Sequence, residues 1–341
     1  MNSITSTLGS RWPQALTRAA ERWAAQSPVC AMACALGAIA TLGIVLDRPY
    51  ITTDAEAHAL IALYEAADMV PKPSFPGDNR IVRANRIAAW FETDEGQAAA
   101  LHCNAIDLSN GELTKLPRQI GRFTNLQHLW LRNNQLQALP PEIGNLVNLQ
   151  FLELGFNQLQ TLPPSIGNLT KLQTLYLYNN LLQALPPEIG NLTELQTLEL
   201  YCNQLQTFPP TIGNLTKLQT LRLQWTQLQT LPPSIGNLTK LQTLWLHGNR
   251  LQTLPSSIGN LTKLQTLQLH DNRLQALPPE IENLANLRDL TLQNNPLEDI
   301  SLELLVQLLT RECTIFVEGP LNLGTIQEVL SKKSARHWHI E

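Results

Sequence analysis

The chain has 341 residues, a formal net charge of −4 and 15% charged residues. This length can bury a sizeable core, and this charge balance fits neither a nucleic-acid-binding protein nor a disordered acidic tail. The five cysteines are odd in number and irregularly spaced, so we expect no disulfide framework, no zinc site and no cofactor, although the spacing leaves a pair such as Cys103–Cys313 open.

The amino-terminal part combines a basic segment with an apolar one. Residues 1–28 carry Arg11, Arg18 and Arg22 against the single acid Glu21, and residues 29–46 are eighteen uncharged residues in a row. A helix of that length measures roughly 27 Å, just enough for a hydrocarbon core of about 30 Å. We therefore predict a membrane-anchor helix at 29–46. The basic flank would keep the amino terminus cytoplasmic and place the rest of the chain outside.

Other interpretations of residues 29–46 stay open. The segment could be a buried helix of a small amino-terminal domain or the core of a signal peptide, although a 28-residue leader is long for the latter. An interfacial helix fits less well, because the segment has no polar face. Without a membrane anchor, the protein would be cytoplasmic.

The next two segments connect this region to the repeats. Residues 47–77 are predicted to form a helix followed by a proline-rich linker, because prolines at 71, 73 and 76 interrupt regular structure. Residues 78–100, with Ile81, Ile87, Trp90 and Phe91, are predicted to form a helix. This helix would cap the apolar end of the first repeat.

Residues 101–299 contain nine repeats with a fixed period of 23 residues. A leucine that closes an L-x-L motif recurs at Leu108, Leu131, Leu154, Leu177, Leu200, Leu223, Leu246, Leu269 and Leu292. Alternation of this kind places leucines on one face of a short strand. Each coil is too small to bury its own leucines, so the coils must stack. We therefore predict an α/β solenoid, a horseshoe with a parallel concave sheet and short helical or 3-10 connectors on the convex side.

Two recurrent features of the repeat have structural explanations. The Pro-Pro pair of most connectors fixes φ and is expected to begin a short helical turn. An asparagine three residues after the closing leucine is expected to bond main-chain groups with its buried amide. Gly111 and Thr226 replace this asparagine in the first and sixth repeats. Because threonine makes fewer hydrogen bonds, we expect the sixth coil to be locally looser or to hold a water.

This consensus, LPPxIGNLxxLQxLxLxxNxL, resembles the 23-residue leucine-rich-repeat class of the Ras-suppressor and scribble-type scaffolds. It is also similar to plant intracellular Ras-group-related and bacterial leucine-rich-repeat proteins. The resemblance covers about residues 101 to 300. It implies an adaptor that binds another macromolecule.

The positions that vary between repeats indicate where a partner binds. The connectors are nearly copied, whereas four columns on the outer side of the strands vary and hold eight of the chain's 19 aromatic residues. Aromatic residues with interspersed charges are typical of interaction hot spots, although aromatic residues also suit strands and pack on each other. The predicted partner-binding residues are Trp130, Arg132, Phe151, Glu153, Phe156, Tyr176, Tyr178, Glu199, Tyr201, Arg222, Trp225, Trp245, His247 and His270.

Residues 300–341 are predicted to form a carboxy-terminal cap with a helix over 300–309, a strand over 313–317 and a second helix around 323–331. Only about 41 residues follow the repeats, and no His or Asp near Cys313 in the sequence would activate it. We therefore expect no enzymatic activity, which disfavours a ubiquitin ligase of the leucine-rich-repeat type. The expected function is protein binding, either by a membrane-anchored receptor or adhesin, or by a soluble adaptor or delivered effector of a cytosolic protein such as a small GTPase.

Overall fold

The computed structural model describes residues 93–111, 113–298, 304, 307, 308, 311, 313–317 and 338–340. The predicted basic segment at 1–28, the predicted anchor at 29–46, the linker at 47–77 and most of the helix predicted at 78–100 lie outside the described residues. So does the helix predicted around 323–331. Within the described part of the chain, no helix is long and apolar enough to span a membrane.

The described chain forms a parallel sheet of eleven strands that follow one another in sequence order. Neighbouring strands of the repeats pair with an offset of 23 residues, as Ile106 pairs with Leu129 and Leu129 with Leu152. The strands are β1 (Ala105–Asp107), β2 (His128–Trp130), β3 (Phe151–Glu153), β4 (Thr174–Tyr176), β5 (Thr197–Glu199), β6 (Thr220–Arg222), β7 (Thr243–Trp245), β8 (Thr266–Gln268), β9 (Asp289–Thr291), β10 (Thr314–Val317) and β11 (Trp338–Ile340). The predicted solenoid is confirmed.

Each connector contains a five-residue 3-10 helix. An extended proline with φ between −66° and −68° precedes all eight helices, and in six of them a second proline begins the helix. The expectation that the Pro-Pro pair begins a helical turn is thus confirmed. The helices are η1 (Arg118–Arg122), η2 (Pro141–Asn145), η3 (Pro164–Asn168), η4 (Pro187–Asn191), η5 (Pro210–Asn214), η6 (Pro233–Asn237), η7 (Ser256–Asn260) and η8 (Pro279–Asn283).

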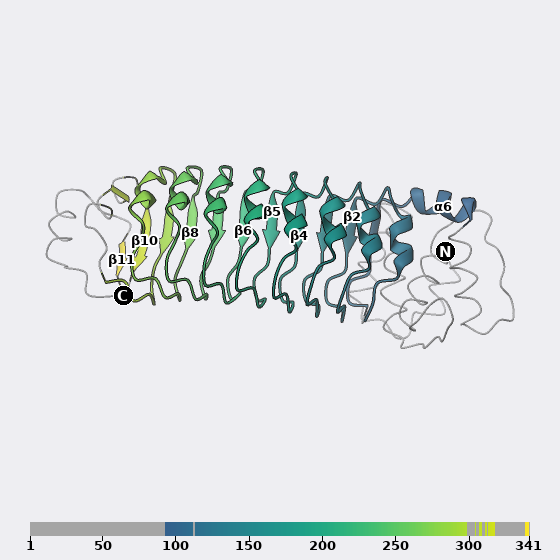
Figure 1. The fold of residues 1–341 in the computed structure, drawn as a ribbon, viewed down its shortest axis with the longest axis horizontal. Coiled ribbons are helices and arrows are strands. Elements are labelled where there is room, and N and C mark those ends of the chain that lie inside the picture. Colours follow the sequence, from purple (N-terminus) through teal and green to yellow (C-terminus); the bar gives the residue numbers. More distant parts are fainter. Residues whose placement is uncertain are drawn as a thin grey trace.

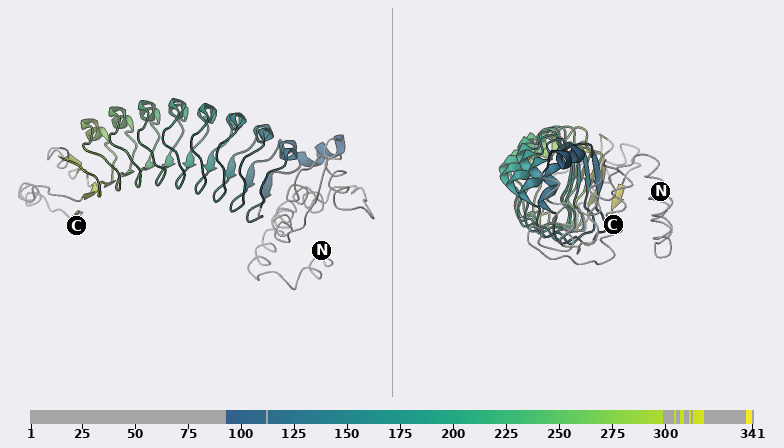
Figure 2. Two further views of the ribbon diagram at one scale, coloured as in Figure 1. Left: turned by 60° about the horizontal axis from the view of Figure 1, so that its bottom comes forward. Right: turned by 90° about the vertical axis from the view of Figure 1, so that its right-hand side faces the viewer.

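The coils stack side by side along one axis, with the strands on one side of each coil and the 3-10 helices on the other (Figure 1). Figure 2 shows that the stack curves gently, with the 3-10 helices along its outer side. Between the two layers lies one continuous core of leucines and isoleucines, most of which are fully buried, such as Leu129, Ile143 and Leu200. The core runs the length of the solenoid because every coil buries its apolar face on its neighbours.

The repeated asparagine acts as predicted. The Asn157 Nδ2 donates to the Leu131 and Leu154 carbonyls at 2.9 and 3.0 Å, and its Oδ1 accepts from the Leu136 amide at 3.0 Å. The other repeats with asparagine show the same pattern, for example at Asn203. One buried amide therefore bonds main-chain groups of two successive coils.

The sixth coil departs from this pattern at Thr226, which is fully buried. The Thr226 hydroxyl lies 2.8 Å from the Leu223 carbonyl and 2.9 Å from the Asn249 Oδ1, and its single proton serves one of these at a time. Within the described residues, the Leu205 amide lacks the asparagine oxygen that its counterparts bond. Gln227 adopts a φ of 72°, which no equivalent residue shares. The expected shortage of hydrogen bonds is present, and the backbone adjusts locally.

Both ends of the solenoid carry additional structure. At the amino-terminal end, α6 (Asp94–Leu101) precedes β1, in the predicted cap region. At the other end, β10 confirms the strand predicted at 313–317, and Leu304 and Leu308 are helical and buried. The strand β11 was not predicted. Cys103 and Cys313 lie at opposite ends of the sheet and form no disulfide, so the pair left open by their spacing is excluded.

Candidate functional site

The face of the sheet that points away from the core is here called the sheet face. It consists of the strand residues of β1–β9 that point away from the core and the two residues that follow Leu108 and each of its equivalents. In most strands the central leucine is buried and the residues on either side of it are half-buried on the outside. All fourteen predicted partner-binding residues lie on this face. Tyr178 and Glu199 are only 8% and 9% exposed, so they support their neighbours rather than offer contact area.

An aromatic cluster occupies the half of the sheet face formed by β2–β5. Each of its rings lies within 4.8 to 6.4 Å of the next, measured between ring centroids. Edge-to-face and offset contacts of this kind stabilise a pair by about 0.5–1.5 kcal/mol beyond burial. The cluster comprises His128, Trp130, Phe151, Phe156, Tyr176, Tyr178 and Tyr201.

Polar groups hold this cluster in place. The Tyr178 hydroxyl donates to the Glu153 carboxylate at 2.6 Å, and burial together with this bond raises the pKa of Tyr178. The Tyr178 ring lies directly over Gly155, where an added Cβ would come within 2.5 Å of it. The Arg132 guanidinium lies 5.3 Å from the centre of the Phe156 ring. The cluster is therefore ordered before any partner binds.

A second cluster, rich in charge, occupies the half formed by β6–β9. The Arg222 guanidinium bonds the Glu199 carboxylate at 3.1 Å and stacks on the Trp245 ring at 4.2 Å. Burial raises the pKa of Glu199, and the charge of Arg222 opposes that shift. Trp245 in turn contacts His247. The interaction between Glu199 and Arg222 joins the two clusters across β5 and β6.

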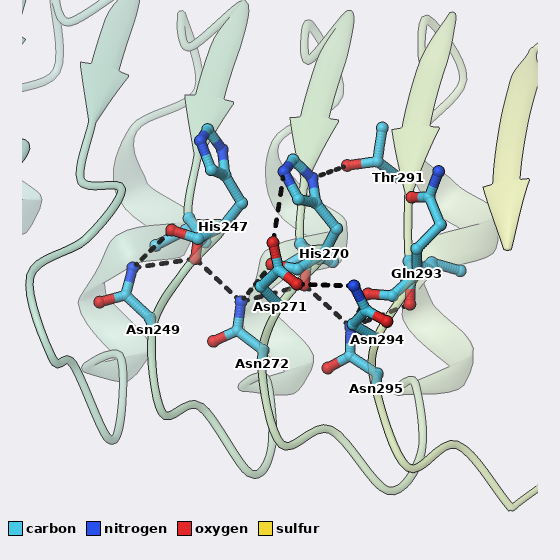
Figure 3. Close-up of polar contacts among 12 residues, drawn as sticks. His247, Asn249, His270, Asp271, Asn272, Thr291, Gln293, Asn294 and Asn295 are labelled. Atoms are coloured by element: carbon cyan, nitrogen blue, oxygen red, sulfur yellow. Dashed lines mark hydrogen bonds and ion pairs between the residues drawn. The ribbon is translucent and has the colours of Figure 1, made fainter. Parts of the chain in front are cut away.

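Two stacked histidines continue this second cluster (Figure 3). The rings of His247 and His270 lie 4.3 Å apart and nearly parallel, and the His270 Nδ1 lies 2.8 Å from the Thr291 Oγ1. Burial lowers the pKa of His247 to about 4, helped by the neighbouring His270 and opposed by Asp271. Burial also lowers the pKa of His270. Both rings are therefore neutral near pH 7.

One column of the sheet face has an unusual backbone that sequence reasoning missed. All nine residues two positions after the closing leucine, from Asn110 to Asn294, adopt φ between 52° and 67°. The column holds four asparagines, an aspartate, a glycine and three residues of other types, and a preference for Asn, Asp and Gly is the sequence mark of the left-handed region. Phe156, Cys202 and Trp225 are the exceptions.

Five buried side-chain polar atoms on the sheet face lack a hydrogen-bond partner, and no other buried side-chain nitrogen or oxygen does so among the described residues. All five belong to β6, β7 and the residues after β6, β7 and β9, so unmet hydrogen-bonding capacity of side chains is confined to the carboxy-terminal half. These atoms are Arg222 Nε, Gln224 Oε1, Trp245 Nε1, His247 Nδ1 and Gln293 Oε1.

The described residues contain no group of three or more His, Cys, Asp and Glu residues placed to hold a metal. Burial raises the pKa of Cys202 and, with the charge of Asp289, raises that of Cys313 to about 12. An acidic residue absent from the local sequence thus lies near Cys313, but it suppresses the thiolate that a nucleophile needs.

Comparison with known proteins gives one family match and several similar structures. A family model described as a leucine-rich repeat region matches residues 102–207, 175–247 and 211–311. A comparison with curated proteins found no match.

The leucine-rich-repeat ectodomain of the plant membrane receptor kinase GASSHO1/SCHENGEN3 from Arabidopsis thaliana, in complex with Casparian strip integrity factor 2, is 32% identical with a TM-score of 0.56. The match covers 70% of this chain and 32% of that one, so this chain spans about a third of its length. PEPR1 with AtPEP1 is 28% identical over 63% of this chain and 36% of that one, with a TM-score of 0.55. FLRT2, in a complex with latrophilin 3 and Unc5D, is 25% identical over 63% of this chain and 69% of that one, with a TM-score of 0.52.

Proposed function

The chain belongs to the leucine-rich-repeat proteins, and from this premise we propose that it is a protein-interaction module whose sheet face binds a protein partner. One observation carries the proposal. The residues that vary from repeat to repeat converge on the sheet face, where they form a continuous aromatic cluster from His128 to Tyr201. A repeat protein needs no such cluster for its fold, because each coil already buries its leucines on its neighbours.

The composition of the sheet face supports a protein partner. Aromatic rings and arginines dominate interaction hot spots because they bring large contact areas with few rotatable bonds. Trp130, Tyr176, Tyr201 and Trp245 are half-buried, and contacts with their neighbours restrict their rotamers before binding. Little side-chain entropy is then lost on association.

The similar structures support the same proposal. GASSHO1/SCHENGEN3, PEPR1 and FLRT2 were each solved in complex with a protein or peptide. We propose that this chain also binds a protein, and that its partner differs from those of the similar structures. The resemblance to the 23-residue Ras-suppressor and scribble-type class belongs to the same proposal.

We also propose that the protein has no enzymatic activity. Burial raises the pKa of the Cys202 and Cys313 thiols, and the Glu153 and Glu199 carboxylates are bonded to Tyr178 and Arg222. Incubating the purified chain with the ubiquitin-activating and ubiquitin-conjugating enzymes tests the ligase alternative. We expect no ubiquitin transfer, and transfer that depends on Cys313 would refute this part of the proposal.

Residues 29–46 are proposed to anchor the protein in a membrane with the repeats outside the cytoplasm. Alkaline extraction without detergent tests the anchor. We expect the full-length chain to remain with the membranes, and its release into the soluble fraction would refute the anchor. Release would favour a cytosolic adaptor, for which a small GTPase is the partner to test first.

A crosslinking pull-down from source cells tests the binding surface. The bait is the full chain, and its matched variant carries Ala at Trp130, Tyr176, Tyr201 and Trp245. The circular dichroism spectrum of the variant must be the same as that of the unmodified chain. We expect a partner captured by the unmodified bait alone. Equal capture by both baits would move the binding site away from the sheet face.

A further inference from the structure

Two aromatic side chains of the sheet face differ from the rest in exposure. Phe156 is 43% and Trp225 is 53% exposed, whereas the other aromatic residues of this face are buried or half-buried. Among the described residues, the remaining large hydrophobic side chains with comparable exposure are Leu101, Val147 and Leu181, none of them aromatic. Two rings therefore project from a surface on which the other rings are packed together.

The backbone at both positions is unfavourable for an aromatic residue. Phe156 has a φ of 55° and Trp225 a φ of 59°, in the column where the fold otherwise prefers Asn, Asp or Gly. A bulky residue in the left-handed region is strained, and such strain is typical of functional positions. Because an asparagine would satisfy the fold at lower cost, stability does not explain either ring.

Both rings are nevertheless held in fixed positions. Phe156 packs edge-on against Tyr178, which lies over Gly155. Trp225 packs edge-on against His247, and its ring covers Gly248, where an added Cβ would lie 2.5 Å from the indole. Each projecting ring thus has a neighbouring glycine that makes room and an aromatic side chain that supports it. A ring held in this way loses little entropy on binding.

A cation accompanies the first ring. The Arg132 guanidinium lies 5.3 Å from the centre of the Phe156 ring, and Arg132 is exposed. Within the described residues, Arg132 forms no ion pair, whereas Arg222, the other arginine on the sheet face, is paired with Glu199. The charge beside Phe156 is therefore available to a carboxylate of a partner.

Resting on the proposed function, we propose that Phe156 and Trp225 are the two anchors of the interface, and that they insert into two apolar pockets of one folded protein. Three strand spacings separate the anchors, about 14 Å at 4.8 Å per strand. Projecting rings require concave sites on the partner, and a folded surface provides these where an extended peptide does not. Charge complementarity places a carboxylate beside the pocket that receives Phe156.

Photocrosslinking in source cells tests this assignment. Three full-length chains are compared, in which p-benzoylphenylalanine replaces Phe156, Trp225 or Tyr176. We expect the first two to crosslink to the same protein, at two sites about 14 Å apart on one folded domain. Capture through Tyr176 alone would overturn the anchors and leave the sheet-face proposal intact. Capture through none of the three would contradict both.

The second test measures the Kd between purified variants of this chain and the crosslinked partner, which is produced separately. We expect Phe156→Asn and Trp225→Asn each to raise Kd by about 30-fold or more. The matched control is Val147→Asn, which removes an exposed apolar side chain outside the sheet face and should leave Kd unchanged. Arg132→Gln should raise Kd by about tenfold and reduce its dependence on salt. Effects of Phe156→Asn and Trp225→Asn no larger than that of the control would overturn the proposal.

A phage-displayed library of random 12-residue peptides separates the two kinds of partner. We expect no enriched peptide whose binding depends on both Phe156 and Trp225. A peptide that binds the unmodified chain and loses binding in both Asn variants would show that the occupant is an extended segment, and the folded-partner proposal would be wrong.

Discussion

A single backbone angle decides which residues the sheet face can present at its most prominent positions. Wherever the chain leaves a strand of the repeats, the second residue after the closing leucine adopts a left-handed φ. Asparagine and glycine tolerate this conformation, whereas most other residues pay about 1–2 kcal/mol for it. Phe156 and Trp225 therefore lower the stability of the fold and expose aromatic area, as expected of residues in a binding surface.

The stability cost of the left-handed backbone can be measured at Phe156. Asn and Ala both remove the ring and its contacts with Tyr178 and Arg132, but only Asn suits the left-handed backbone. We predict that the free energy of unfolding is about 1 kcal/mol higher for Phe156→Asn than for Phe156→Ala. Denaturant titration of the two variants measures this difference. The same pair of substitutions at Tyr176, in a strand, should show no advantage for Asn, and an equal advantage there would contradict the backbone explanation.

Burial of the His247 imidazole makes the stability of the fold depend on pH. Burial lowers the pKa of His247 to about 4, below the value of about 6.5 expected in the unfolded chain. Between these two values the unfolded state binds a proton that the folded state does not, so acidification favours unfolding. The free energy of unfolding should therefore fall as the pH decreases from about 6.5 to about 4.

Thermal melts across this pH range test the prediction, with His247→Gln as the comparison. Removing the imidazole should flatten the pH dependence in this window, because the replacement does not titrate. His270, whose pKa is also lowered by burial, should account for part of the slope that remains. An identical slope in His247→Gln and in the unmodified chain would show that His247 is not the responsible group.

At the scale of one coil, the buried asparagine and the Pro-Pro connector explain most of the geometry. The asparagine amide bonds two successive coils, and the prolines set the entry to each 3-10 helix. The sixth coil shows what happens when the asparagine is replaced, since Thr226 leaves the Leu205 amide without its usual acceptor and Gln227 turns left-handed.

We predict that Thr226→Asn stabilises the protein. By analogy with Asn203, the new Oδ1 would accept from the Leu205 amide and the new Nδ2 would donate to the Leu200 and Leu223 carbonyls. Satisfying a buried amide should raise the free energy of unfolding by about 1–2 kcal/mol. Equilibrium unfolding in urea measures the change. A lower unfolding free energy would mean that the sixth coil is already fitted to threonine.

The fold could be predicted because the sequence repeats a simple physical pattern. The spacing of Leu108, Leu131 and their equivalents fixes the strands, and the prolines fix the connectors. The strand β11 could not be predicted, because it belongs to no repeat and, within the described part of the chain, pairs only with β10. On the sheet face, the sequence indicated the residues but not their burial, so Tyr178 and Glu199 were predicted as contacts although neighbouring coils cover them.

For the whole molecule, stability depends on closing the ends of the solenoid. The strand β10 bonds the edge of β9 through the Leu292 amide and the Phe316 carbonyl at 2.7 Å, and Leu304, Leu308 and Cys313 are buried at this end. Without them, the apolar end of the ninth coil would face water.

We predict that a chain ending at residue 299 melts roughly 5–10 °C below the full chain, which corresponds to a loss of about 2–3 kcal/mol. Differential scanning calorimetry measures the shift, with light scattering to detect association through the exposed end. A chain ending at residue 337, which lacks only β11, should lose less. Equal melting temperatures for the full chain and the chain ending at 299 would show that the ninth coil needs no cover.

Binding through the sheet face involves the whole solenoid, because this face extends from β1 to β9. Its most direct test is the Kd of the captured partner for two variants of equal folded content. One carries Ala at Trp130, Tyr176, Tyr201 and Trp245. The other carries Gln at Lys171, Lys240 and Lys263, which are exposed in the connectors. We predict a Kd at least about 100-fold higher for the first variant and an unchanged Kd for the second. An unchanged Kd for the first variant and a raised Kd for the second would place the binding site on the connectors and contradict binding through the sheet face.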